Sequence, residues 1–210
     1  MATSTTPAWT ARQRDILACT LELVREHGLA HVTTKLIAER VGFTEAALYR
    51  HFPTKQALLL GLMDRLEDML LGPIQKTAGD GAIPVSQRLE RIIRHHATLV
   101  REQNSLPILL LAEASASDDP ALLGRMRSIF HDYLSVLEGL VREGQARGEI
   151  VHGPEPDCLA LLLLGSPAAL AIRHRLLPDA RAEDRFETTL IPFLVDTIDD
   201  TLDKGSRRKE

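Results

Sequence analysis

The chain has 210 residues, a formal net charge of −4 at pH 7 and only 4% aromatic residues. This length suits one large domain or a small domain joined to a medium one, and 44% apolar residues are enough to build a core. Leu and Ala dominate, while Val, Tyr and Thr rarely form alternating runs, so the composition favours an all-α protein over a β-sheet protein.

Secreted, membrane and disulfide-rich proteins are disfavoured by the same features. The N-terminus has neither the basic region nor the apolar region of a secretion signal, and the most apolar run, 159–164, is far shorter than a membrane span. The two cysteines, Cys19 and Cys158, lie far apart in apolar helical patterns, where buried reduced thiols are expected. We therefore expect a soluble, cytoplasmic protein without membrane contact.

Apolar residues recur at helical spacing, and caps and breakers divide the chain into about nine expected helices. The first spans 9–27, Gly42 ends the second, and Thr44 caps the third, because glycine favours helix C-termini and threonine favours N-termini. The fourth, capped by Thr54, is expected to break at the Gly-Pro pair 72–73. The remaining helices are expected at 84–103, 106–115, 120–147, 155–177 and 182–202.

The chain is expected to divide into a small domain over 1–53, a larger helical body over 54–204 and a polar tail over 205–210. Residues 1–56 contain seven Lys or Arg and five acidic residues, a net charge of +2, which leaves −6 for the rest. Attraction to phosphate is local and is screened within about 8–10 Å. The acidic overall balance is therefore compatible with a DNA-binding N-terminal domain.

The stretch 33–55 is typical of a helix-turn-helix, in which one helix crosses the DNA backbone and the next enters the major groove. Free backbone N–H groups at helix starts, together with Lys35 and Lys55, suit phosphate oxygens. The start and exposed face of the third helix suit base edges, and Tyr49 and His51 at its end suit phosphate. The candidate DNA-binding residues are Thr33, Thr34, Lys35, Thr44, Glu45, Ala46, Tyr49, Arg50, His51 and Lys55.

Each of these residues also has a structural explanation when it is taken alone. Thr44 can serve only as a cap, Tyr49 as a core aromatic residue, and His51 as a solvated surface residue. The ordered combination of caps, a glycine turn and a terminal Tyr-Arg-His-Phe is what favours DNA binding.

Residues 10–60 resemble the N-terminal domain of the TetR/AcrR family of bacterial transcription regulators. The resemblance rests on Thr34, Ile37, Ala38, Val41, Gly42, Phe43, Thr44, Leu48, Tyr49, His51, Phe52, Lys55 and Leu58. It implies a repressor that responds to a small-molecule effector and binds a palindromic operator as a homodimer, with no cofactor. The run 45–53 also resembles a nucleoid-associated branch of the family, in which DNA binding is coupled to cell division through a protein partner. That function is the alternative.

The resemblance also implies that the body over 54–204 binds the effector and forms the dimer. The last two helices would pair with those of a second copy, although periodicity alone also allows a core within one chain. The expected dimer residues are Leu162, Ala169, Ile172, Leu190, Leu194 and Ile198. The expected effector pocket among the middle helices is lined by Met63, Leu66, Leu110, Met126, Phe130, Tyr133 and Ser166. Pro167 and Pro192 fall inside helical patterns, and either could kink a helix and open a cavity.

Catalytic and metal chemistry find little support in the sequence. His95 and His96 are adjacent and point to different sides of a helix, while His131, His152 and His174 have no partners at metal-ligand spacing. The sequence contains no Gly-x-Ser-x-Gly, no phosphate-binding glycine loop and no Cys/His cluster. We expect neither an enzyme nor a metal site; an enzyme or ligand carrier that ignores DNA is the alternative of a different class.

Overall fold

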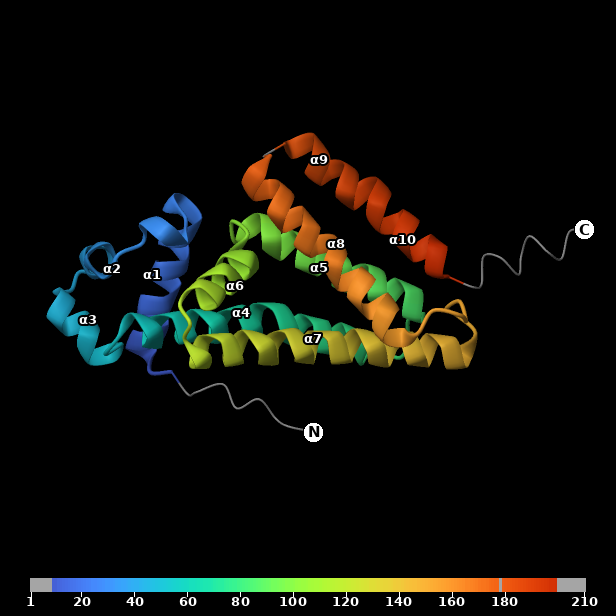
Figure 1. Ribbon diagram of the computed structural model, residues 1–210, viewed down its shortest axis with the longest axis horizontal. Coiled ribbons are helices and arrows are strands. Elements are labelled where there is room, and N and C mark those ends of the chain that lie inside the picture. The colour runs from blue at the N-terminus through green and yellow to red at the C-terminus, as the bar shows by residue number, and fades with distance from the viewer. Residues whose placement is uncertain (1–8, 178, 200–210) are drawn as a thin grey trace, which may run out of the picture. The chain divides into compact units, whose positions relative to one another are not determined.

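The computed structural model describes residues 9–177 and 179–199 (Figure 1). Every regular element in that part of the chain is a helix, which confirms the all-α prediction. The helices, in chain order, are α1 Ala11–His27, α2 Thr34–Val41, α3 Glu45–His51, α4 Lys55–Ala78, α5 Val85–Glu102, α6 Leu106–Ala116, α7 Pro120–Arg147, α8 Pro156–Leu176, α9 Ala180–Arg185 and α10 Ile191–Ile198. A short 3₁₀ turn, Leu29–His31, follows α1, and a π-helical segment, Phe186–Leu190, joins α9 to α10.

The chain forms two compact units whose boundary falls inside α4 and inside α7. Unit 1 comprises 1–68 and 102–126, and unit 2 comprises 69–101 and 127–210. In unit 1, α1, α2 and α3 gather around the first turns of α4 (Figure 1, blue to cyan). Unit 1 is thus wider than the domain expected over 1–53, because α6 and the first turns of α4 and α7 belong to it.

Unit 1 is held together by close packing of α4 on α1 and by a buried ion-pair group. A Cβ atom on Gly61 would lie 2.9 Å from Leu17 Cδ2, so a larger residue at this position would require the Leu17 side chain to shift. Arg125 of α7 donates to Asp64 at 2.7 Å and to Glu67 at 2.5 Å on α4. Burial raises the pKa of Asp64 above its ordinary value. These contacts fix the start of α4, and with it the elements that precede it.

The predicted helix break at the Gly-Pro pair 72–73 is wrong, because α4 continues to Ala78. Proline at position 73 cannot donate to the carbonyl of Met69, four residues earlier. That carbonyl instead accepts a hydrogen bond from His95 Nε2 of α5 at 2.8 Å. Ile74 is fully buried, so packing also favours continuation of the helix. A partner from another helix therefore offsets the usual cost of the proline.

Pro167 is likewise inside α8, and the Leu163 carbonyl that it leaves unpaired accepts from Ser166 Oγ at 3.0 Å. The expected last helix, 182–202, is instead divided into α9, the π-helical segment and α10, and 200–202 lie outside the described residues. Pro192 is the second residue of α10, separated from the π-helical segment by Ile191, and a proline that crowds the preceding turn is a known cause of such irregular helix geometry.

Unit 2 contains α8 and the α9–α10 segment as an antiparallel pair (Figure 1, orange and red). By length and composition, α8 could cross a membrane, and 39% of its most apolar window is buried in the protein. Cys19 is buried as expected, whereas Cys158, near the start of α8, is exposed, so the expectation of a buried thiol is wrong there. Both cysteines are free thiols.

Candidate nucleic-acid interface

Helices α2 and α3 form a helix-turn-helix whose local sequence explains each boundary. Thr33 caps α2 by accepting from Leu36 N at 3.2 Å, and Thr44 caps α3 by accepting from Ala47 N at 3.2 Å. Between them, Gly42 adopts the left-handed conformation with φ of 78°, as its place in the turn requires. The cap predicted at Thr44 and the helix end predicted at Gly42 are therefore confirmed.

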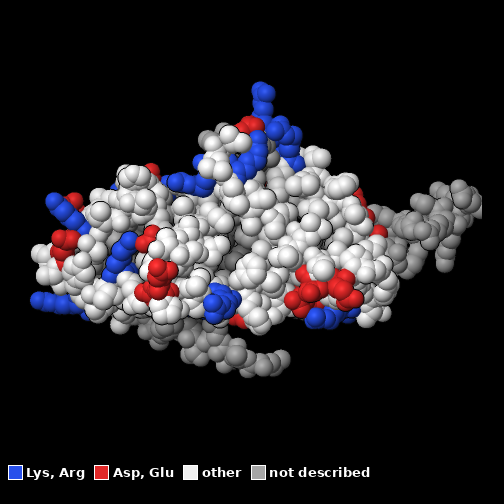
Figure 2. All heavy atoms as spheres, viewed as in Figure 1, with Lys and Arg blue, Asp and Glu red and all other residues white. Residues whose placement is uncertain are grey.

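The buried side chains of this motif leave its polar side chains facing solvent. Ile37, Ala38 and Leu48 point into unit 1, with 2% or less of each side chain exposed. Of the ten candidate DNA-binding residues, Thr34 and His51 are half-buried and the other eight are exposed. Lys and Arg side chains alternate with acidic ones over this end of unit 1 (Figure 2). Individual contacts, rather than one strongly basic field, would therefore attract phosphate.

Three of the candidate residues are linked across the two helices. Thr34 Oγ1 donates to Glu45 Oε1 at 2.8 Å, and Tyr49 OH lies 3.5 Å from Thr34 Oγ1. Through Thr34, the start of α2 is thus hydrogen-bonded to both the first turn and the last turn of α3. The start of α2 is also where we expect a phosphate contact. This arrangement fixes the direction in which α3 leaves the turn.

The ammonium group of Lys55, at the start of α4, is paired in the protein. Lys55 Nζ donates to Glu113 Oε1 of α6 at 2.7 Å, and the neighbouring Gln56 Nε2 donates to Asp119 Oδ2 at 2.6 Å. Lys55, Glu113, Thr34 and Tyr49 are among the residues that line a cavity of about 360 Å³ in unit 1. The sequence did not predict that Glu113 pairs with Lys55, because a pair separated by 58 residues leaves no local pattern.

Helix α1 contributes two residues that sequence reasoning also missed. Gln13 Nε2 donates to the carbonyl of His51 at 3.1 Å, at the end of α3. The guanidinium of Arg12 lies 4.7 Å from the ring centroid of Phe43, and that ring stacks on His51 with centroids 6.1 Å apart. The only signal in the sequence is the aromatic residue at position 43, in the turn. Arg12 and Gln13 therefore support the end of the helix that would carry base and phosphate contacts.

The seven residues expected to line an effector pocket divide between the two units. Met63, Leu66, Leu110 and Met126 are buried in unit 1, where they contribute to its core. In unit 2, Phe130 is exposed and Tyr133 is buried. Tyr133 packs against His96, with ring centroids 5.3 Å apart. From the sequence, His96 was considered only as a metal ligand, and that role was rejected.

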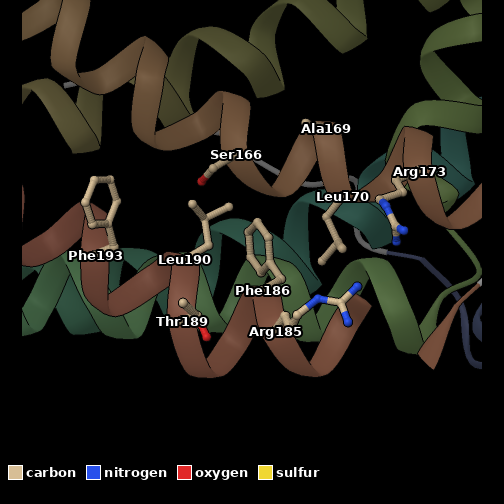
Figure 3. A pocket seen from close by; sticks show the side chains of 9 residues that line it. All are labelled: Ser166, Ala169, Leu170, Arg173, Arg185, Phe186, Thr189, Leu190 and Phe193. Atoms are coloured by element: carbon tan, nitrogen blue, oxygen red, sulfur yellow. The ribbon is translucent and has the colours of Figure 1, made fainter. Parts of the chain in front are cut away.

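Ser166 lines a cavity of about 520 Å³ between α8 and the segment from Arg185 to Phe193 (Figure 3). Apolar side chains of Leu170, Phe186 and Leu190 point into it, while Arg173 and Arg185 lie at one end (Figure 3). Both guanidinium groups lie 3.6 Å from the carboxylate of Asp179. Pro167 and Pro192 belong to the two facing segments, but neither is among the residues that line the cavity.

An exposed apolar face runs along the same two helices. Among the expected dimer residues, Leu162, Ala169, Ile172 and Leu190 are exposed and Leu194 is half-buried. Ile198 is only 3% exposed and belongs to the core of its own unit, so it is not available to a partner. The face also includes residues that sequence reasoning omitted: Leu161, Leu176 and Phe193.

Known proteins resemble this chain in sequence and in fold. The family profile for bacterial regulatory proteins of the tetR family matches residues 16–62. The nucleoid occlusion factor SlmA of Vibrio campbellii is 30% identical over 160 residues, which are 74% of this chain and 80% of that protein. A transcriptional regulator of the TetR/AcrR family from Thermobifida fusca has a TM-score of 0.69 at 25% identity, over 89% of this chain and 97% of that one. AibR, in complex with isovaleryl coenzyme A and operator DNA, has a TM-score of 0.66 at 22% identity, over 88% and 98% of the two chains, which shows the shared fold.

Proposed function

Because the chain belongs to the TetR/AcrR family and is a DNA-binding transcriptional regulator, we propose that it is a cytoplasmic repressor whose homodimer binds a palindromic operator and leaves it when a small molecule binds. Members of this family are generally not enzymes. The observation that carries the proposal is the capped helix-turn-helix with eight exposed candidate DNA residues on one unit.

In the proposed complex α3 enters the major groove. Its first turn, with Glu45 and Ala46, reads base edges, because a carboxylate accepts from cytosine N4 and a methyl group contacts the thymine methyl. Thr33 and Lys55 lie at the starts of α2 and α4, where free N–H groups and the helix dipole favour a phosphate. Tyr49 at the end of α3 adds a hydroxyl for a third backbone contact. These contacts hold the helix in register while the base contacts select the sequence.

A homodimer is proposed because a single helix-turn-helix makes few base contacts, and two copies read two half-sites. The exposed apolar face on α8 and α10 supports this assignment. Leu162, Ile172, Leu176 and Phe193 are each about half or more exposed, in a chain whose other large apolar residues are mostly buried. Large apolar side chains exposed together on neighbouring segments favour a protein–protein interface.

The effector is proposed to act through unit 1. AibR is named for a complex with isovaleryl coenzyme A and operator DNA, so this fold accommodates a small-molecule ligand in at least one regulator. In the present chain, α6 holds the start of α4 through Glu113 and Lys55. Any ligand that displaces α6 would therefore move the start of α4 and change where Lys55 lies relative to α2 and α3.

A second function is favoured by the similarity to SlmA, a nucleoid occlusion factor. In that case the chain would bind many chromosomal sites and respond to a protein rather than to a small molecule. The two functions share the DNA contacts and differ in the number of sites and in the second partner.

Selection of bound genomic fragments, repeated in the presence of candidate metabolites, tests the proposal. A ligand-responsive repressor is expected to enrich few fragments that share one palindrome, and at least one metabolite is expected to abolish the enrichment. Many scattered sites that persist with every metabolite would support the nucleoid-associated function instead. Enrichment of no fragment would contradict both functions.

A further inference from the structure

Two buried polar side chains meet inside unit 2, and one polar atom of each has no hydrogen-bond partner among the described residues. His96 of α5 and Tyr133 of α7 are 5% and 2% exposed, and their rings are in an edge-on contact with centroids 5.3 Å apart. Neither His96 Nδ1 nor Tyr133 OH has a hydrogen-bond partner among the described residues. The proposed DNA contacts all lie in unit 1, so DNA binding does not account for this pair.

The buried residues one helical turn from each member of the pair are apolar. One turn away on α5 lie Ile92, Ile93 and Val100, and one turn away on α7 lie Ile129 and Leu137, all of them buried. A buried hydroxyl or imidazole without a partner is destabilising, and a phenylalanine or leucine of similar shape would avoid that cost. Two such groups in ring contact therefore indicate that a partner is supplied from outside the chain.

The charge states restrict what that partner can be. Burial lowers the pKa of His96 to about 4, so its ring is neutral at pH 7. Burial also raises the pKa of Tyr133, so its hydroxyl remains protonated and able to donate. His95, the adjacent ionisable group, is engaged with the Met69 carbonyl at 2.8 Å. A carboxylate or an ammonium group brought here would lose its hydration without gaining a countercharge from the pair.

We infer that His96 and Tyr133 form the polar anchor of a buried site for an uncharged ligand that carries a hydroxyl or carbonyl group. A hydroxyl both donates and accepts, so one such group can bond to both side chains. The inference rests on the proposed function, because this ligand would be the effector. It adds a chemical class: the group of the effector that contacts His96 and Tyr133 is uncharged.

The chain contains only two tyrosines, Tyr49 on the proposed DNA surface and Tyr133 in this site. Fluorine NMR of protein labelled with 3-fluorotyrosine therefore reports the two events separately, and Tyr133→Phe assigns the resonances. Primary alcohols of four to ten carbons and the matching carboxylates serve as probes. At least one alcohol is expected to shift the Tyr133 resonance and leave Tyr49 unchanged, while its carboxylate shifts neither at the same concentration.

Several outcomes would overturn the inference. The inference fails if no alcohol shifts the Tyr133 resonance, which is the result expected when a trapped water fills the site. It also fails if a carboxylate shifts the Tyr133 resonance as strongly as the matching alcohol does. Operator DNA is added to the same sample as a separate arm. If DNA leaves Tyr49 unchanged, the proposed docking of α3 fails, whatever the alcohols do at Tyr133.

Thermal unfolding gives a second readout that needs no ligand. Tyr133→Phe removes a hydroxyl without a partner and is expected to raise Tm by about 2–4 °C. Tyr49→Phe is the matched control, because the Tyr49 side chain is exposed, and is expected to change Tm by less than about 1 °C. A fall in Tm for Tyr133→Phe would mean that the hydroxyl is satisfied in the free protein and would overturn the inference.

Discussion

Replacing Glu113 with glutamine removes the carboxylate that lies 2.7 Å from the Lys55 ammonium. In the free protein the Glu113 carboxylate pairs with the Lys55 ammonium, which we propose binds a phosphate in the DNA complex. The carboxylate and the phosphate therefore compete for Lys55. The side chains of Lys55 and Glu113 are 69% and 33% exposed, which makes this a solvent-screened pair. Exposed ion pairs contribute about 0.2–1 kcal/mol. Glu113→Gln is therefore expected to tighten DNA binding by about 1.4- to 5-fold.

Fluorescence anisotropy with a labelled operator, measured over a series of salt concentrations, checks this prediction. The gain must depend on Lys55, so it is expected to vanish when Glu113→Gln is combined with Lys55→Ala. Glu138→Gln is the matched control: it makes the same charge change in unit 2, where Glu138 accepts from Arg142 at 2.9 Å. A gain that survives in the Lys55→Ala background, or an equal gain from the control, would refute competition for Lys55.

Three further predictions concern other parts of the chain. Lys55→Ala is expected to weaken binding to all sequences and to lower the slope of log K against log salt by about 0.9, because one phosphate contact is lost; titrations at several salt concentrations measure it, and an unchanged slope would remove Lys55 from the interface. Phe193→Asp, on the exposed apolar face, is expected to produce monomers in analytical ultracentrifugation while the circular dichroism spectrum stays helical; an intact dimer would relocate the interface. Glu143→Gln is expected to lower the free energy of unfolding by about 1–3 kcal/mol at pH 7 in urea titrations, because Glu143 pairs with buried Arg88. The hydrogen bond from Arg88 lowers the pKa of Glu143 below its ordinary value of 4.5, so this stability is present above pH 4.5 and is lost as the pH falls through the lowered pKa; equal acid sensitivity of the variant and the parent would contradict the assignment.

The helix-turn-helix could be predicted from the sequence because its determinants are local. Thr33 and Thr44 cap helices through contacts three residues away, and Gly42 ends α2 through its own backbone conformation. The same local rules fail at position 73, where proline should break α4. The partner that rescues the helix, His95, lies 26 residues from Met69, and no periodicity connects the two.

The parts of the candidate sites that depend on distant pairs could not be predicted. Glu113 reaches Lys55 across 58 residues, and Gln13 reaches His51 across 38. His96 and Tyr133 each look like ordinary helix residues in sequence, and only packing shows that their polar atoms are buried together. Apolar periodicity also could not separate Ile198, which is buried in its own unit, from the exposed Ile172.

Sequence-specific DNA binding is the central claim, and one titration tests it most directly. Anisotropy at physiological salt compares the palindrome recovered from genomic selection with a scrambled duplex of equal composition. We expect the palindrome to be bound at least about 1,000-fold more tightly, and we expect binding to both duplexes to weaken as salt is raised. Equal affinity for the two duplexes would contradict it, because α3 would then contribute no base contacts.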